Sequence, residues 1–326
     1  MRTSNSPVEK YRLRIVFWET TTACNLRCRH CRRLSTGPGA HEFGTDEAKE
    51  WIGALSDWCH PLLILSGGEP LMRPDVVELA SFARERGLAV ALATNGMLMT
   101  EKIAGELSGA GVRRVGVSLD GARSETHDGL RGVEGAFDAA LNAIRIVRAA
   151  GVSTQINMTV CRENRDEVGE IVRLAEREGV KAVHFFVFVP VGCGLDWGKD
   201  QSLSAVECED LLNWFRRYEK SAGIETRLTC APQYRRIPAE DRQEGGMTGP
   251  ASPSGCLGGK SVCFVSHAGD VFPCGYLPVA AGNVRDRSLK EIWEGADLFR
   301  ELRDADKLGA PCGACVYKET CGGCRA

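Results

Sequence analysis

The chain has 326 residues, of which 43% are hydrophobic and 26% charged, a balance typical of a globular protein in water. Its formal net charge of −2 gives no reason to expect a nucleic-acid or anionic-membrane partner. No apolar run approaches the ~20 residues that cross a bilayer, and the N-terminus lacks the apolar core of a signal peptide, so we expect a cytoplasmic protein.

Residues 13–190 alternate short apolar runs with longer amphipathic stretches. The stretches at 45–58, 74–87 and 135–151 predict helices. The apolar runs predict strands at 13–19, 62–66, 89–94, 113–120, 152–160 and 182–189. This alternation indicates right-handed βαβ units and a parallel sheet. Because six units are too few for a closed eight-stranded barrel, we expect an α/β fold with a partial, TIM-like (β/α)6 barrel.

The composition changes after this predicted barrel. We expect an N-terminal extension at 1–12, the barrel at 13–195 and a polar bridging region at 196–250, with a flexible connection at 244–255. Residues 251–326 form a small cysteine-rich domain in this scheme. Its core is too small to stand alone, so bound metal would supply part of its folding energy.

The chain has 15 cysteines, which are rarely kept as disulfides in a reducing cytosol. Cys24, Cys28 and Cys31 follow the first predicted strand directly. A zinc site would need a fourth ligand, for which only His30 is near, and a redox pair would leave Cys24 unused. A [4Fe–4S] cluster on three thiolates would use all three and leave one iron open. Spacing alone leaves these alternatives open.

Further polar and glycine residues stand where the next strands end, and barrel active sites are built at this edge. The second strand is followed by Gly67-Gly68-Glu69-Pro70, where the glycines let a ligand approach the backbone and Glu69 could pair with an ammonium group. Asn95 follows the third strand. Ser118 and Asp120, at the end of the fourth, alternate and so face one side, which suits a ribose diol.

The Cys24-x3-Cys28-x2-Cys31 spacing with Gly67-Gly68-Glu69-Pro70 downstream resembles the radical S-adenosylmethionine (SAM) superfamily. The resemblance implies a [4Fe–4S] cluster on the three cysteines, with SAM chelating the open iron and yielding a 5′-deoxyadenosyl radical. It also implies SAM contacts from the strand ends: Gly67, Gly68, Glu69 and Pro70 at the methionine amino group, Asn95 nearby, Ser118 and Asp120 at the ribose, and Arg131 at the carboxylate. The residue before the third cysteine is often aromatic in this superfamily, and here it is His30.

The C-terminal region contains two further groups of cysteines, with the spacings Cys256-x6-Cys263-x10-Cys274 and Cys312-x2-Cys315-x5-Cys321-x2-Cys324. Two zinc knuckles are one interpretation, because C-x2-C pairs suit zinc. Behind a radical SAM barrel, the spacing is similar to the SPASM extension, which carries auxiliary [4Fe–4S] clusters.

By that resemblance the first auxiliary cluster has four ligands, namely Cys256, Cys263, Cys274 and Cys324. The second would use Cys312, Cys315 and Cys321. Its fourth ligand is expected beyond Ala326, so the domain reads as truncated. Four other cysteines are interpreted as structural: Cys59, Cys161, Cys208 and Cys230. Cys193 follows the last predicted barrel strand and is expected near the mouth of the barrel.

Segments 17–32, 60–75, 263–285 and 321–326 resemble the haem-biosynthesis branch of the superfamily. That branch implies an iron-porphyrin substrate, Fe-coproporphyrin III, two propionates of which are oxidatively decarboxylated to give haem b. It also implies a low-potential electron donor such as ferredoxin or flavodoxin. A substrate with several carboxylates needs cationic partners, for which the candidates are Arg32, Arg33, Arg235, Arg236, His30 and His184.

Three alternatives remain. One is related removal of tetrapyrrole side chains. Another is a SPASM maturase that forms thioether bonds, C–C crosslinks or formylglycine in a peptide or protein, although such enzymes often carry a leader-binding domain ahead of the barrel. The third is a non-catalytic iron–sulfur or zinc scaffold, which would have no use for the Gly-Gly-Glu-Pro and Ser-Leu-Asp motifs.

Overall fold

A single curved sheet organises the molecule. The computed structural model describes residues 11–33, 39–219, 223–237 and 255–326. Within these ranges the sheet has the strand order β10-β9-β8-β1-β2-β3-β4-β5-β6-β7. The strands are β1 (Ile15–Glu19), β2 (Leu62–Ser66), β3 (Ala89–Thr94), β4 (Arg114–Ser118), β5 (Ser153–Val160), β6 (Ala182–Val187), β7 (Glu225–Thr229), β8 (Val262–Val265), β9 (Asp270–Phe272) and β10 (Gly282–Asn283). All neighbours from β8 through β1 to β7 are parallel, which confirms the predicted α/β fold.

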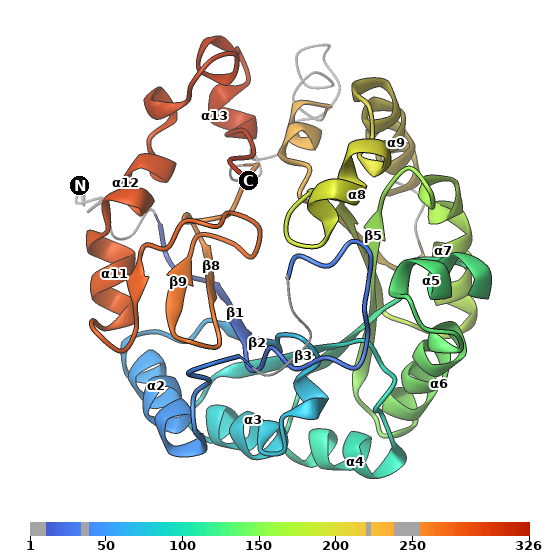
Figure 1. Cartoon of the computed structure of the whole chain (residues 1–326), viewed down its shortest axis with the longest axis vertical. Coiled ribbons are helices and arrows are strands. Elements are labelled where there is room, and N and C mark those ends of the chain that lie inside the picture. Colours follow the sequence, from blue (N-terminus) through green and yellow to red (C-terminus); the bar gives the residue numbers. More distant parts are fainter. Residues whose placement is uncertain (1–10, 34–38, 220–222, 238–254) are drawn as a thin grey trace, which may run out of the picture.

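Helices cover the outer face of this sheet (Figure 1). The α-helices are α2 (Thr45–Trp58), α3 (Val76–Glu85), α4 (Glu101–Gly109), α5 (Ser124–Arg131), α6 (Ala136–Ala149), α7 (Val168–Arg177), α8 (Gly194–Gln201), α9 (Ala205–Glu219), α11 (Leu289–Gly295), α12 (Asp297–Arg303) and α13 (Lys318–Cys321). Short 3-10 helices are η1 (Pro70–Met72), η2 (Arg165–Glu167), η3 (Pro232–Arg235), η4 (Ala305–Lys307) and η5 (Cys312–Ala314).

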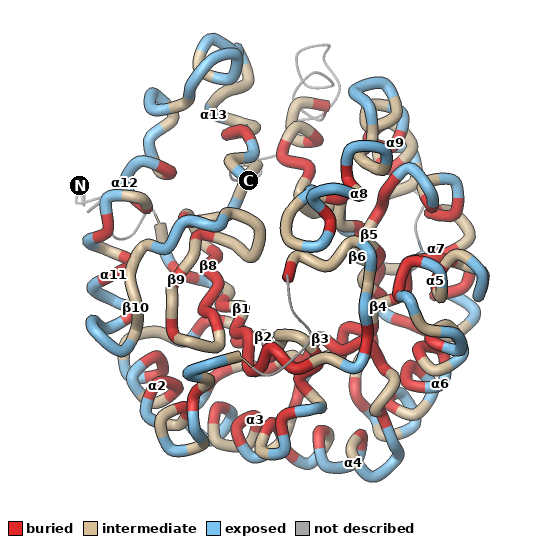
Figure 2. The backbone as a smooth tube through the Cα atoms, viewed as in Figure 1, coloured by how far each residue is buried: buried red, intermediate tan, exposed pale blue. Residues whose placement is uncertain are grey.

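The strands bury alternate residues, as a sheet with one face under helices requires. In β5 every second residue is buried, ending with Ile156, Met158 and Val160. The Trp18 ring of β1 packs 4.9 Å from the Trp51 ring of α2, measured between centroids. Figure 2 shows the buried residues concentrated on the strands and on the inner sides of the helices. The carboxyl ends of the parallel strands are thereby held at one edge.

The expected bridging region contributes a strand, so the barrel does not end after β6. Strand β7 pairs in parallel with β6, with Ala182 opposite Glu225 and Phe186 opposite Thr229. Residues 244–254 of the expected flexible connection and residues 1–10 of the expected N-terminal extension lie outside the described residues.

The C-terminal region shares the sheet and the core of the barrel. Strand β8 pairs in parallel with β1 at the edge opposite β2. Val265 of β8 and Trp293 of α11 belong to the same buried cluster as the barrel strands. The expected C-terminal domain therefore packs into the core of the barrel, since β8 joins it to the barrel directly. No helix in the described ranges is long and apolar enough to cross a membrane.

Candidate functional site

A cavity of about 800 Å³ opens at the carboxyl ends of the barrel strands. Most of the residues expected to hold a cofactor line it: Cys24, Cys28, Cys31, Gly67, Gly68, Asn95, Ser118 and Arg131. Arg27, Arg29 and Cys193, with Trp197 and Tyr276, complete much of the wall. Glu69, Pro70 and Asp120 are buried and stand outside this lining. The strand ends thus bring residues from distant parts of the sequence around one space.

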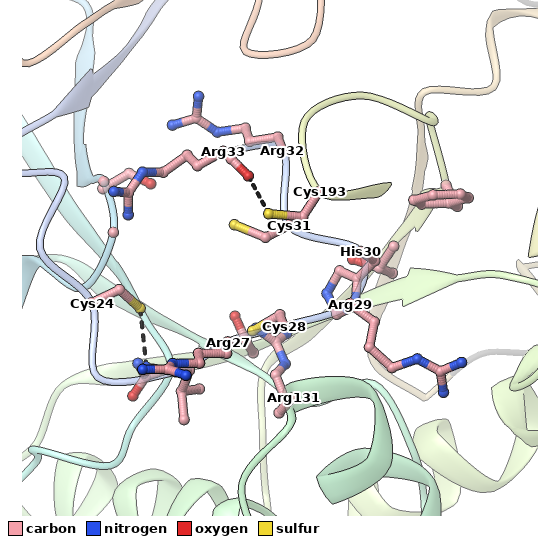
Figure 3. A pocket seen from close by; sticks show the side chains of 18 of the residues that line it. Cys24, Arg27, Cys28, Arg29, His30, Cys31, Arg32, Arg33, Arg131 and Cys193 are labelled. Carbon is pink, nitrogen blue, oxygen red and sulfur yellow. Dashed lines mark hydrogen bonds between the residues drawn. The ribbon is translucent and has the colours of Figure 1, made fainter. Parts of the chain in front are cut away.

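The three N-terminal cysteines line that space as free thiols, and Cys193 Sγ donates to the Arg33 carbonyl at 2.6 Å (Figure 3). Burial raises the pKa of Cys24, and it raises that of Cys28 to about 11. Two N–H groups point at these sulfurs: the Leu26 amide at 3.5 Å from Cys24 Sγ and Arg131 Nη1 at 3.7 Å from Cys28 Sγ. The donors suit thiolates, and binding of iron would remove the thiol protons.

The backbone of Gly68 and Glu69, just after β2, clamps the cysteine loop to the sheet. The amide of Gly68 donates to the carbonyl of Thr21 at 2.8 Å, and that of Glu69 to the carbonyl of Ala23 at 2.7 Å. A Cβ on Gly67 would lie 2.4 Å from the Thr21 carbonyl oxygen, and one on Gly68 2.1 Å from that of Ala23. Glycine is therefore required here by the backbone of the cysteine loop itself, in addition to the ligand approach expected from the sequence.

Glu69 joins the ends of β2 and β3 beneath the cavity. Its carboxylate accepts hydrogen bonds from the Thr94 hydroxyl and the Asn95 amide, both at 2.7 Å, and from the Leu71 amide at 3.1 Å. Burial raises the pKa of this carboxyl despite those bonds. The Asn95 side chain in turn donates to Asn25 Oδ1 at 2.8 Å, which fixes the cysteine loop from a second side. The contact of Glu69 with a methionine amino group stays a prediction.

Asp120 occupies a different place from the one expected. It is fully buried, and Oδ2 lies 2.7 Å from Arg131 Nη2 and 3.2 Å from His30 Nε2. Its other oxygen accepts from the Thr159 amide at 2.8 Å. Burial tends to raise the pKa of Asp120, but Arg131 and the two neighbouring histidines hold it below its usual value. As it stands, Asp120 fixes Arg131 and His30 in position, whereas Ser118 remains at the cavity wall.

His30, expected as a cationic substrate contact, is held as a neutral ring. Burial lowers its pKa to about 4, and Arg131 adds to that effect. His184 is likewise half-buried, with Nδ1 3.0 Å from Gln155 Nε2, and burial lowers its pKa to about 4. Neither histidine therefore supplies positive charge near neutral pH, because desolvation disfavours the imidazolium.

Arg32 and Arg33, also expected to meet an anionic substrate, turn to Glu19. Arg32 Nη2 lies 3.0 Å and Arg33 Nε 3.8 Å from Glu19 Oε1. His267 Nδ1 is 2.8 Å from the other carboxylate oxygen. Although burial opposes it, His267 and Arg32 together lower the pKa of Glu19. No sequence pattern predicts this ion-pair cluster, because Glu19 is the last residue of an apolar strand and His267 is far along the chain.

Of the other two expected arginines, Arg236 forms an ion pair with Glu209 at 2.5 Å and Arg235 lies in η3. The exposed cations on the cavity wall are Arg27 and Arg29 instead. Arg29 lies 3.3 Å from Glu163 and over the Trp197 ring. Arg27 forms no ion pair with any residue in the described ranges, so its charge faces solvent and the cavity mouth.

Three of the four cysteines expected at the first auxiliary cluster lie together. A Cβ on Gly258 would be 3.7 Å from Cys256 Sγ and 3.6 Å from Cys274 Cβ, so these residues flank one glycine. Cys256 and Cys274 are also close enough to Cys324 to help raise its pKa, to which burial contributes most. Cys263 is elsewhere: it is fully buried in β8, opposite Val16 of β1. The prediction that Cys263 is a ligand conflicts with this placement, because its side chain is part of the apolar core.

The second group of C-terminal cysteines also gathers. The Cys315 amide donates to the Cys312 carbonyl at 3.1 Å, and both thiols lie near that of Cys321. Gly322 and Gly323 both have positive φ, at 72° and 63°, and turn the chain between Cys321 and Cys324. Two consecutive residues with positive φ avoid backbone strain only when both are glycine.

These arrangements fit iron–sulfur clusters. In a four-iron cluster each thiolate binds a different iron, so the sulfurs need not converge on one point. Across the described residues, no three His, Cys, Asp or Glu side chains are close enough to hold a single ion. A partial barrel with three free thiols at its mouth fits a protein that holds a [4Fe–4S] cluster with one iron open to a further ligand.

Comparison with known proteins agrees with this assignment. Residues 18–175 match the radical SAM superfamily, and residues 256–324 match SPASM, an iron–sulfur cluster-binding domain. The chain belongs to the radical SAM superfamily and carries a C-terminal SPASM domain. The scaffold alternative and the zinc interpretation are thereby ruled out in favour of an enzyme whose cofactors are SAM and [4Fe–4S] clusters.

Among its relatives is the AdoMet-dependent heme synthase of Methanosarcina barkeri, 46% identical over 96% of this chain and 91% of that protein. The mycofactocin maturase MftC of Mycobacterium tuberculosis is 34% identical over 95% of this chain and 77% of the relative. SuiB of Streptococcus suis, solved with S-adenosylmethionine, superposes with a TM-score of 0.75 at 16% identity, covering 96% of this chain and 73% of SuiB. That likeness concerns the fold. The identity to the first relative places the chain with the haem-biosynthesis branch.

Proposed function

We propose that the enzyme oxidatively decarboxylates two propionate side chains of an iron-porphyrin, converting Fe-coproporphyrin III to haem b. The observation that carries this proposal is the 46% identity, over 96% of the chain, to the AdoMet-dependent heme synthase of Methanosarcina barkeri. When bound, the cluster and SAM supply a 5′-deoxyadenosyl radical able to abstract hydrogen from an unactivated carbon. We assign the cluster to Cys24, Cys28 and Cys31.

The proposed reaction balances for each side chain. A hydrogen atom leaves the propionate β-carbon and is recovered in 5′-deoxyadenosine. The side chain then loses CO2 and one electron and becomes a vinyl group. We assign that electron to the auxiliary clusters of the SPASM domain, and the electron that initiates SAM cleavage to a low-potential ferredoxin or flavodoxin.

The cavity has features that support a large anionic and partly apolar substrate. Its volume of about 800 Å³ is within the usual range for ligand sites. Phe188 and Trp197 supply apolar wall, and their rings pack 5.3 Å apart. Arg27 and Arg29 supply positive charge at the rim, and guanidinium groups pair well with carboxylates. We infer that Arg27, which has no ion-pair partner in the described ranges, receives a propionate.

Turnover tests the proposal directly. Anaerobically reconstituted enzyme is given SAM, a low-potential reductant and Fe-coproporphyrin III, and the porphyrin products are followed by mass spectrometry. We expect two successive losses, each of one CO2 and two hydrogens, with 5′-deoxyadenosine formed in step. Formation of 5′-deoxyadenosine with no change in the porphyrin would contradict the proposed substrate while leaving the radical chemistry intact.

A second candidate is peptide modification, which the 34% identity to mycofactocin maturase MftC favours. The same assay separates the two functions, because a peptide-modifying enzyme would leave the porphyrin mass unchanged. It would instead show 5′-deoxyadenosine formation that rises when the correct peptide is added. A third, related candidate is removal of other tetrapyrrole side chains, which would give different mass losses.

A further inference from the structure

Cys230, interpreted from the sequence as structural, stands at the mouth of the barrel. It follows β7 directly, so it lies at the same edge of the sheet as the cysteine loop that follows β1. Its backbone is left-handed, with φ at 58°, a conformation that residues with a Cβ seldom adopt. The 3-10 helix η3 begins two residues later, and η3 packs against α13, which ends at Cys321.

The cysteines near α13 are the ones that Cys230 approaches. Backbone bonds tie the two C-terminal segments together: the Gly255 amide donates to the Thr320 carbonyl at 2.8 Å, and the Cys256 amide to the Cys321 carbonyl at 3.2 Å. The thiols of Cys324, Cys274 and Cys256 are close enough to that of Cys230 to raise its pKa, to which burial contributes most.

Cys263 has a different neighbouring thiol. In β8 it is fully buried, and the thiol that influences it is Cys59, which follows helix α2 on the outer side of the sheet. The strand pairing with β1 fixes this orientation, because a residue in a strand can change face only if the register slips. Cys263 therefore cannot reach Cys256 or Cys274 while β8 stays paired.

We propose that Cys230 is the fourth protein ligand of the first auxiliary cluster, together with Cys256, Cys274 and Cys324. Four thiolates leave no open iron, so this cluster transfers electrons and does not bind substrate through iron. Tyr276 stands between the two sites: it lines the SAM cavity and lies near the thiols of Cys230 and Cys274. The cluster is thus placed to accept the electron that the substrate loses in the proposed decarboxylation, an assignment that rests on the proposed function.

The ligand assignment is tested in the full chain with Cys24, Cys28 and Cys31 all changed to alanine, so that reconstituted iron reports on the SPASM domain. Cys230→Ser and Cys263→Ser are compared in this background. Iron and sulfide contents are measured, and EPR spectra are recorded after reduction with dithionite. We expect Cys230→Ser to alter the EPR signal of one cluster or to lower the iron content by up to about four atoms per chain. Cys263→Ser should match its parent in both measurements.

A second variant addresses the case in which serine still binds iron. Cys230→Ala should open one iron to an outside ligand, so added 2-mercaptoethanol should shift the EPR spectrum of the variant and not that of its parent. Unchanged iron content and spectra in both Cys230 variants would overturn the assignment, as would loss of a cluster in Cys263→Ser alone. Because neither readout involves porphyrin, the ligand assignment can fail while the proposed function stands.

Discussion

Arg131, the last residue of α5, donates a hydrogen bond to the Cys28 sulfur, with 3.7 Å between Nη1 and Sγ. The same guanidinium lies 2.7 Å from Asp120 through Nη2. Although burial opposes it, Asp120 and Cys28 raise the pKa of Arg131, so its positive charge is fixed. A buried cation that donates to a ligating sulfur stabilises added negative charge on that ligand set, and outer-shell partners of this kind tune bound metals.

Arg131→Gln should therefore lower the midpoint potential of the SAM-binding cluster, by an amount on the order of tens of millivolts, because a charge-assisted hydrogen bond is lost. The measurement is an EPR-monitored redox titration without SAM. Arg29→Gln, an exposed arginine of the same loop, is the matched control and should leave the potential unchanged. An unaltered potential in Arg131→Gln, accompanied by a higher KM for SAM, would assign Arg131 to the SAM carboxylate alone.

Gly68→Ala should disrupt the cysteine loop, because the new Cβ would lie 2.1 Å from the Ala23 carbonyl oxygen and 2.6 Å from that of Thr22. We expect less iron bound at the N-terminal site after reconstitution and a lower melting temperature. Gly53→Ala is the control: it lies within α2, where nothing is within 4 Å of the new Cβ. That substitution should be neutral or stabilise the fold by about 0.5–1 kcal/mol. Equal iron content in the two variants would contradict the proposed clamp.

Glu19→Gln should destabilise the protein by about 1–3 kcal/mol, since Arg32 and His267 would lose a charged partner in a mostly buried setting. The control is Glu47→Gln, which removes an exposed ion pair with Arg285 and should cost less than about 1 kcal/mol. The Glu19–His267 and Glu47–Arg285 pairs both link the barrel to the SPASM domain. The difference between the two losses of stability therefore reports the effect of burial. Chemical denaturation of the reconstituted enzyme measures the difference, and equal losses would contradict the argument.

The Glu19 carboxyl should also make the free energy of unfolding depend on pH. The folded pKa of Glu19 lies below its ordinary value, with Arg32, Arg33 and His267 around it. Its contribution to stability is thus present above the unfolded pKa and lost as the pH falls through the folded value. As the pH falls from about 5 to about 3, the difference in unfolding free energy between the wild-type protein and Glu19→Gln should shrink, because Glu19 becomes protonated in the folded state. A constant difference over this range would show that Glu19 does not titrate as described.

Arg27→Gln should raise the KM for Fe-coproporphyrin III roughly tenfold, equivalent to about 1.4 kcal/mol, while SAM binding is retained. We expect SAM cleavage to become partly uncoupled from decarboxylation, seen as excess 5′-deoxyadenosine per vinyl group. Arg145→Gln, an exposed arginine paired with Glu178 on the outer helix α6, serves as the control. If the two variants have the same KM, the propionate contact lies elsewhere.

The sequence predicted the first six strands within a few residues, since apolar runs such as 62–66 and 89–94 carry a strong periodic signal. Strand β7 has no such signal, because Glu225–Thr229 is mostly polar and none of its residues is buried. The position of Cys230 at the mouth of the barrel was missed with it, because that position depends on following a strand. A useful signal was still available: a cysteine directly after a possible strand, like Cys24 after β1.

Side-chain pairing was the other part that the sequence could not supply. The arginines that follow Cys31 looked available for a substrate, yet Glu19 engages both, and the partners are brought together only by the fold. Asp120 likewise alternates with Ser118 along the chain but lies beyond the end of β4, where Arg131 and His30 enclose it. Periodicity predicts which face a residue occupies within a strand and loses that power once the strand ends.

The pairing of β8 with β1 has a practical consequence for modularity. Hydrogen bonds join the SPASM domain to the strand that leads into the SAM-binding cysteines, so a chimera cut between 237 and 255 would exchange one flank of the active-site scaffold along with the auxiliary clusters. Cys230 lies on the barrel side of such a cut and three of its proposed partners on the other. A different radical SAM barrel could therefore accept this SPASM domain only if it supplies a compatible first strand and a cysteine directly after its seventh strand.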